Sequence, residues 1–118
     1  MGVNVTEASP ERVVGTMPVE GNTQPYGLLH GGASCVLAET LASLGSYVHG
    51  RPNRVGVGVD INATHHRPAT SGWVTGTATA LRLGRNVVTY EVVLHDDSGQ
   101  RICTARVTCQ LVEGSVGP

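Results

Sequence analysis

The chain has 118 residues, a length that suits a single domain, and we expect residues 1–118 to form that domain with its core at about 11–112. Its 8 basic side chains, all arginines, nearly balance 9 acidic ones and give a formal net charge of −1. The absence of a basic tail or charge run argues against a nucleic-acid partner. No apolar run reaches the roughly 20 residues of a membrane span, and no signal pattern begins the chain, so we expect a cytoplasmic protein without a membrane partner.

The three cysteines lie inside apolar, periodic segments. An odd number in such positions predicts reduced, buried thiols rather than a disulfide framework. Cys103 and Cys109 are six residues apart on one strand face, too far for a closely spaced metal knuckle. We therefore expect no metal site.

The first elements in chain order are two short strands, residues 2–8 and 11–19, which form a hairpin at a sheet edge around a turn at Pro10. Residues 21–27 are rich in Gly, Asn, Thr, Gln and Pro, which predicts a loop.

A helix is predicted from His30 or Gly31 to Tyr47 or Val48, because apolar residues recur there at three- and four-residue steps. Small residues fill most of the remaining positions, and few are polar. We therefore expect a helix that is buried nearly all round and wrapped by other elements.

Four strands follow, separated by short turns, at 54–64, 72–83, 87–96 and 101–112, and residues 113–118 are expected to form a flexible tail. One apolar helix with one antiparallel sheet is an α+β arrangement in which a curved sheet wraps the helix. The other sheet face is rich in Thr and Val, so a second copy of the chain is expected to cover it.

A polar, glycine-rich turn begins the helix. Gly31 and Gly32 leave backbone N–H groups accessible to a ligand, because the first donors of a helix have no intrahelical partner. Such a donor stabilises charge on a carbonyl oxygen in acyl transfer, and the amide of Gln24 can add to it. The alternative is a purely structural helix start with His30 as its cap.

Glu39 is the one carboxylate of this apolar helix, and burying it is costly unless it is paired or used. Ser43 lies four residues on, on the same face, within reach of the carboxylate or of a water. Glu39 is a candidate nucleophile or general base, and the structural alternatives are a buried carboxylate satisfied by hydrogen bonds or simply an exposed one.

The spacing of these groups has a consequence for assembly. Gly31 and Glu39 are eight residues apart, so helical rise separates them by roughly 12 Å. A Glu side chain cannot span that distance to an acyl carbon held at Gly31. One reaction that uses both residues therefore requires Glu39 from a second copy, with the two helices antiparallel, and we expect a homodimer with shared active sites.

A second group of polar residues follows the 54–64 strand. His65 and His66 face opposite ways on an extended chain, so one of them can line a pocket, and Arg67 can bind a phosphate. Arg82 and Arg85 are further anion candidates. A polar strand end and solvated charges are the structural alternatives.

The run QPYGLLHGGASCVLAE at residues 24–39, followed by INATHHR at residues 61–67, resembles the signature of the hotdog-fold acyl-CoA thioesterases. The most similar branch contains the Arthrobacter-type 4-hydroxybenzoyl-CoA, phenylacetate-pathway, 1,4-dihydroxy-2-naphthoyl-CoA and enterobactin proofreading thioesterases. The resemblance implies hydrolysis of an aromatic or related acyl-CoA, with coenzyme A as part of the substrate and no cofactor. Alternatives are proofreading of acyl groups on a carrier protein, a hotdog hydratase or dehydratase, and a non-catalytic acyl-CoA-binding module.

The resemblance also implies roles for residues. Gln24 and the Gly31 amide polarise the thioester carbonyl, and the partner's Glu39 attacks it or activates water. Ser43 positions that water, and His30 and His65 line the acyl or thiolate side. Arg67, Arg82 and Arg85 are candidates for binding the nucleotide phosphates, and Gly32 is a further substrate-binding residue. Family members are usually homotetramers built as dimers of dimers, which is the assembly expected here.

Overall fold

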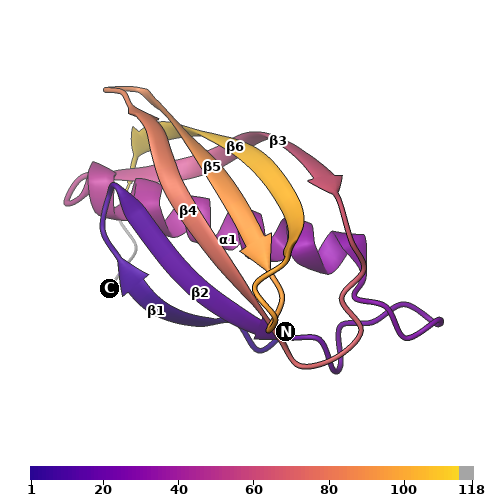
Figure 1. Cartoon of the computed structure of the whole chain (residues 1–118). Coiled ribbons are helices and arrows are strands. Elements are labelled where there is room, and N and C mark those ends of the chain that lie inside the picture. Colours follow the sequence, from indigo (N-terminus) through magenta and orange to yellow (C-terminus); the bar gives the residue numbers. More distant parts are fainter. Residues whose placement is uncertain (115–118) are drawn as a thin grey trace.

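The computed structural model describes residues 1–114, in which one helix packs against a six-stranded antiparallel sheet (Figure 1). The elements are β1 (Asn4–Ala8), β2 (Arg12–Pro18), α1 (Gly31–Gly50), β3 (Arg54–His65), β4 (Trp73–Leu83), β5 (Val87–His95) and β6 (Arg101–Glu113). Each predicted strand and the predicted helix is present. Glu113, expected in a flexible tail, is the last residue of β6, and residues 115–118 of that expected tail lie outside the described part.

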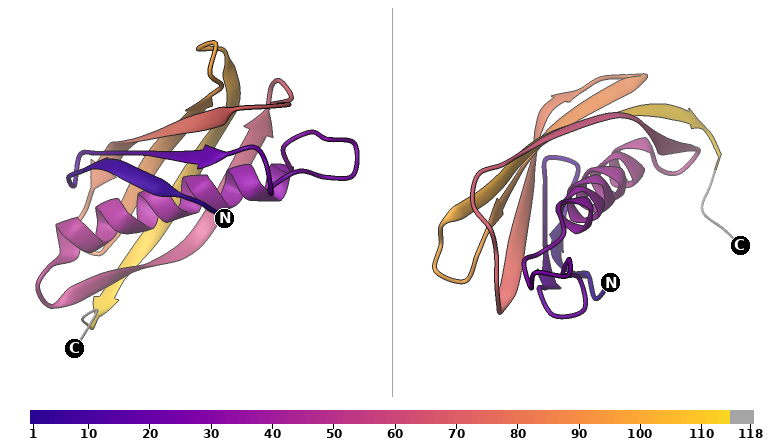
Figure 2. Two further views of the ribbon diagram at one scale, coloured as in Figure 1. Left: turned by 90° about the horizontal axis from the view of Figure 1, so that it is seen from below. Right: turned by 90° about the vertical axis from the view of Figure 1, so that its right-hand side faces the viewer.

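The strand order is β1-β2-β4-β5-β6-β3. The chain leaves the sheet after β2, runs through α1 and returns at the far edge as β3, so β1 and β3 are the two edges. The sheet curves and α1 lies along its concave side (Figure 2). This arrangement confirms the α+β hotdog fold.

Close approach of α1 to the sheet depends on small residues in the strands. A Cβ atom at Gly15 or at Gly76 would lie 2.8 Å from a methyl group of Leu41. Glycine at these two positions therefore leaves room for the Leu41 side chain, which is fully buried. The sheet contributes the alternate, inward-facing residues of β2, β4, β5 and β6 to the core, among them Met17, Tyr90 and other side chains with no exposed surface.

The side of α1 next to β3 is not covered within one chain. Val36 is 41% exposed, and Glu39 and Thr40 are also exposed. On β3 itself Val59 and Ile61 are 56% and 36% exposed. The expectation of a helix buried nearly all round is therefore wrong for the single chain, because β3 is an edge strand that leaves one side of α1 open.

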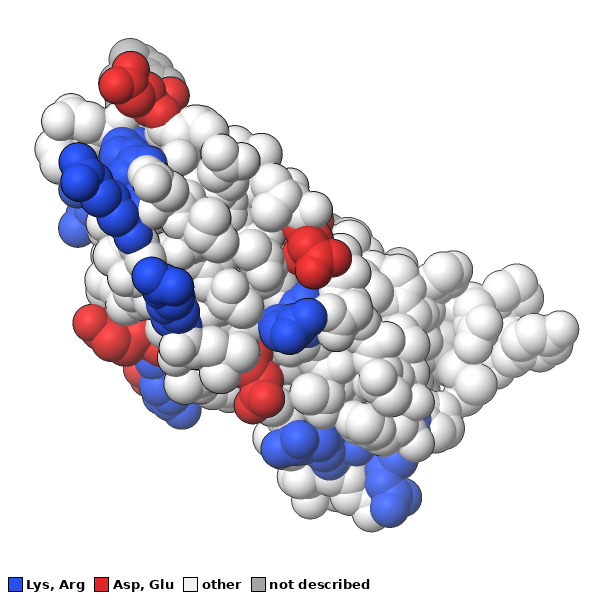
Figure 3. Space-filling view, turned by 90° about the horizontal axis from the view of Figure 1, so that it is seen from above, with Lys and Arg blue, Asp and Glu red and all other residues white. Residues whose placement is uncertain are grey.

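Most of the surface seen in Figure 3 is uncharged, with acidic and basic side chains interspersed rather than gathered in one field. Among the described residues, the one ion pair joins Arg12 to Glu7 at 2.6 Å. Two of the thiols, Cys103 and Cys109, are buried as expected, whereas Cys35 is partly exposed. No helix in the described part is long and apolar enough to cross a membrane.

Candidate active site

The N-terminus of α1 is capped by His30, which has extended backbone angles (φ −67°, ψ 132°). The Gly32 N–H donates to Nδ1 of His30 at 2.9 Å. The N–H groups of Ala33 and Ser34 donate to the His30 carbonyl oxygen at 2.9 and 3.3 Å. Among residues 1–114, no acceptor is found for the remaining donor of this first turn, the N–H of Gly31. The turn also holds no acidic side chain, so the positive end of the helix dipole is not neutralised.

The loop before α1 is held by several hydrogen bonds, and it extends beyond the end of the sheet in Figure 1. The His30 N–H donates to the Asn22 carbonyl at 2.9 Å, and the Leu29 N–H donates to the Ala69 carbonyl at 2.8 Å. The Asn22 amide in turn donates to the carbonyls of Met1 and Pro18. Asn22 is a positioning residue that the sequence did not single out, because an asparagine in a loop carries no signal of its own.

A pocket of about 330 Å³ opens beside this N-terminus. Four residues predicted for the site line it together: Gln24, Gly31, His65 and Arg67. Its apolar lining comes from Leu28, Leu29, Pro68, Ala69 and Ile102. A hydrogen-bond donor at a helix N-terminus, a side-chain amide and an apolar wall are the features that bind and polarise a carbonyl group.

The two histidines at the end of β3 lie in different surroundings. His65 covers Gly31, since a Cβ atom at Gly31 would lie 3.0 Å from Nε2 of His65. His66 pairs through Nε2 with the Thr104 hydroxyl at 2.9 Å. Both histidines line the pocket, although the sequence predicted that one of them would. His65 does so against α1, and the His66 imidazole does so while bound to β6.

Glu39 and Ser43 do not line the pocket of their own chain. Glu39 is exposed, as one of the structural alternatives had it, and its carboxylate lies against β3, where a Cβ atom at Gly58 would lie 2.7 Å from Oε2. Ser43 lies near Cys109. Burial raises the pKa of the Cys109 thiol, and hydrogen bonds from Ser46 and Ser43 lower it in part.

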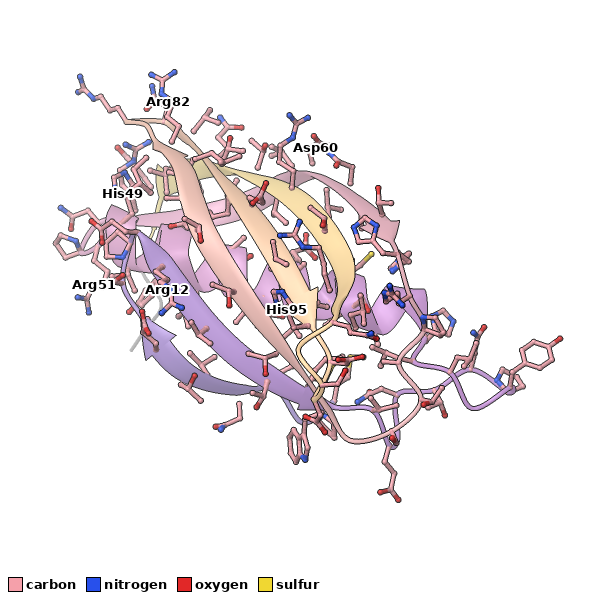
Figure 4. All side chains as sticks on the ribbon, in the orientation of Figure 1. Arg12, His49, Arg51, Asp60, Arg82 and His95 are labelled. Carbon is pink, nitrogen blue, oxygen red and sulfur yellow. The ribbon has the colours of Figure 1, made fainter. Side chains whose placement is uncertain are left out.

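Arg82 and Arg85 are also far from this pocket. Arg82 and His49 lie at the end of the molecule opposite the N-terminus of α1 (Figure 4). The turn that carries Arg85 is held by Arg54, whose guanidinium donates to the Arg85 carbonyl and to Oδ1 of Asn86. One chain therefore places these arginines and the pocket at opposite ends of the helix.

The chain is similar to known thioesterases both in sequence and in structure. A model of the family described as the thioesterase superfamily matches residues 26–103. The proofreading thioesterase EntH of Cronobacter turicensis is 43% identical over 109 residues, which is 92% of this chain and 80% of that protein. The crystal structure of thioesterase HI1161 from Haemophilus influenzae superposes with a TM-score of 0.90 at 36% identity, covering 94% of this chain and 78% of that one.

A third similar protein is thioesterase enzyme SAV0944 from Staphylococcus aureus, at 32% identity and a TM-score of 0.88, covering 92% of each chain. Crystal structures of this protein include one with a glutamine replaced by alanine and one with a glutamate replaced by alanine. The two replaced positions are fifteen residues apart, as Gln24 and Glu39 are.

Proposed function

Because this chain belongs to the thioesterase superfamily and is a thioester hydrolase, we propose that it is a proofreading enzyme that releases wrongly loaded acyl groups from an acyl-carrier protein. The similarity to proofreading thioesterases such as that of Cronobacter turicensis, over 92% of the chain, favours this substrate class. In such a reaction, water replaces the carrier thiol at the acyl carbon, and the products are a free acid and the free thiol.

The observation that carries the proposal is the N–H of Gly31, which has no acceptor among residues 1–114, in a pocket that Gly31 and Gln24 both line. A thioester carbonyl oxygen bound by this N–H and by the Gln24 amide gains charge as the carbonyl carbon becomes tetrahedral. The positive end of the α1 dipole stabilises that charge further. His65 and Arg67, which line the same pocket, contact the substrate beside the carbonyl.

The group that attacks comes from a second copy in this proposal. Helical rise keeps Glu39 roughly 12 Å from Gly31 along α1, beyond the reach of its own side chain. The exposed apolar residues on the open side of α1 and β3 (Val36, Val59 and Ile61) are where two copies would pack with antiparallel helices, which would bring the partner's Glu39 to the pocket. Such pairs would associate further into a homotetramer.

Glu39 then acts as general base or as nucleophile. As a base, it takes a proton from water, the hydroxide forms a bond to the carbonyl carbon, and the thiolate leaves and is reprotonated. As a nucleophile, its carboxylate forms a mixed anhydride with the acyl group as the C–S bond breaks and the thiolate leaves and is reprotonated. Water then hydrolyses the anhydride to the free acid and restores the Glu39 carboxylate. Ser43, one turn further along α1, holds the water in either case.

A second candidate substrate is a free aromatic acyl-CoA. The observation in its favour is the placement of Arg82 and Arg85 at the far end of α1. Antiparallel pairing would carry that end toward the partner's pocket, where the guanidinium groups could pair with nucleotide phosphates. A carrier protein has no nucleotide for them to bind.

Mixing two inactive variants tests the shared site. Each proposed site combines Gln24 of one chain with Glu39 of the other. Gln24→Ala and Glu39→Gln each remove one of these two groups from every site, so each pure variant is expected to lose at least about a hundredfold in kcat. After equal mixing and subunit exchange, half of the dimers are mixed and each has one intact site, so about a quarter of wild-type activity should return. No recovery in mixtures that mass spectrometry shows to contain mixed dimers would refute the shared site.

The substrate class is tested on the wild type by comparing acylated carrier protein with the matching acyl-CoA. Proofreading predicts a higher kcat/KM for the carrier-bound acyl group. The replacement of Arg82 and Arg85 together by Gln is the matched control, since it should weaken turnover of acyl-CoA and spare the carrier. A preference for acyl-CoA that this double replacement removes would favour the second candidate instead.

A further inference from the structure

The geometry points to His30 as a positioning residue that aims the Gly31 N–H, acting through its cap on Gly32 rather than by contact with the acyl or thiolate group. This inference rests on the proposed function, in which Gly31 binds the carbonyl oxygen. It differs from the role that the resemblance implies for His30, which is to line the pocket. His30 is in fact absent from the residues that line the pocket, whereas Gly31 and Gln24 line it.

The first step is the distribution of donors at the start of α1. A helix begins with N–H groups that have no intrahelical acceptor. His30 satisfies two of them: Nδ1 accepts from Gly32, and its carbonyl oxygen accepts from Ala33 in addition to the ordinary helical bond from Ser34. The Gly31 N–H is therefore the one donor of the first turn left for a ligand among the described residues, and its direction is set by the cap.

The second step is the rigidity of the cap. The His30 N–H is itself bound to the carbonyl of Asn22, which is only 8% exposed. The preceding residue, Leu29, is bound to Ala69. The backbone is thus fixed immediately before Gly31, and a fixed donor stabilises a developing oxyanion more than one that must reorient.

The third step is the protonation state of the ring. Because the Gly32 N–H donates to Nδ1, that nitrogen carries no proton, and the neutral imidazole has its proton on Nε2. A ring protonated on both nitrogens cannot accept this hydrogen bond. The cap therefore requires one tautomer of neutral His30.

The experiment uses three variants of the full-length chain that separate the two ring nitrogens. The Asn side chain places its amide oxygen near the position of Nδ1, and Asn is among the best helix caps. The longer Gln side chain extends to the position of Nε2 and is a poor cap. His30→Ala should lower kcat on the order of tenfold, less than the loss of an oxyanion donor itself. His30→Asn should recover most of kcat, and His30→Gln should not.

Nuclear magnetic resonance supplies a readout besides activity. In the wild type the His30 ring should show an unprotonated Nδ1, and the Gly32 amide should be protected from hydrogen exchange. His30→Asn should keep that protection, and His30→Ala and His30→Gln should lose it. Recovery of kcat by Gln and not by Asn would overturn the inference and assign His30 a direct contact with substrate.

The two proposals fail in different ways. If Gln24→Ala and Glu39→Gln keep full activity, the proposed site is wrong, whatever His30 does. If both are inactive while His30→Ala keeps wild-type kcat despite an unprotected Gly32 amide, the site stands and the positioning role of His30 is refuted.

Discussion

The imidazole of His65 lies against the backbone of Gly31, so that a Cβ atom at position 31 would lie 3.0 Å from Nε2 of His65. The end of β3 therefore covers the first residue of α1, although the two residues are far apart in the sequence. Glycine at position 31 serves this contact rather than an unusual backbone angle, because its φ is not positive.

Gly31→Ala should displace His65 and lower kcat by roughly tenfold to a hundredfold, because both residues line the proposed carbonyl-binding pocket and the added methyl group would meet the His65 ring. Adding His65→Ala frees the space, so the double variant should recover part of the kcat lost by Gly31→Ala. Steady-state kinetics of the two single variants and the double variant measure the coupling. Strictly additive losses would show that the contact between positions 31 and 65 does not matter for catalysis.

Val59→Asp should both dissociate the proposed dimer and abolish activity. Val59 is 56% exposed on the edge strand β3, and a carboxylate there would be buried without a partner in the proposed dimer. Sedimentation velocity and turnover of the same sample measure both effects. Val5→Asp is the control, because Val5 is also exposed, at 37%, but lies on β1, the opposite edge of the sheet. Full activity in monomeric Val59→Asp would contradict the shared site.

Tyr90 should make stability depend on pH in the alkaline range. Its hydroxyl donates to the Pro10 carbonyl, and burial raises the pKa of Tyr90 to about 12 from an ordinary value of 10.0. The neutral phenol is the form that the fold favours, so its contribution is complete below pH 10 and is lost as the pH rises to about 12. Ionising Tyr90 in the folded protein therefore lowers the free energy of unfolding by on the order of 2 kcal/mol.

Tyr90→Phe should therefore lower the free energy of unfolding at pH 7 by about 1 kcal/mol, because the Pro10 carbonyl loses its donor. Tyr90→Phe should also make the free energy of unfolding fall less steeply between pH 10 and pH 12. Urea unfolding across this range measures both. Tyr26→Phe is the control, since Tyr26 is 85% exposed and should leave the profile unchanged. If the free energy of unfolding of Tyr90→Phe falls as steeply as that of the wild type, a group other than Tyr90 causes the alkaline loss of stability.

The thiols should differ in reactivity. Burial raises the pKa of Cys103 to about 11, and Cys109 is also buried with a raised pKa. At pH 8 the native protein should therefore be modified at no thiol other than Cys35, and the urea-unfolded chain at all three, because the thiolate is the reactive form. Peptide mapping after alkylation locates the label. Rapid labelling of Cys103 in the native protein would contradict this burial.

The sequence was sufficient to predict the elements because their signals are local. The two-residue alternation of β3 and the three- and four-residue apolar steps of α1 depend only on neighbouring residues. The same holds for the glycine-rich turn before α1 and for the separation of Gly31 from Glu39, which follows from helical rise alone. These local rules predicted that one chain cannot complete the site.

Tertiary structure decided what depends on strand order and on side-chain direction. Because β3 is an edge strand, one side of α1 stays open and Glu39 is exposed, which no pattern within the helix could reveal. Only the fold brings His65 to Gly31, because these residues are far apart in the sequence. Only the fold also holds the His30 N–H on the Asn22 carbonyl, because that contact depends on how the loop between them folds back. The sequence by itself thus determined the chemical groups and their spacing along the helix. The tertiary structure decided which groups share a pocket, because that depends on long-range packing.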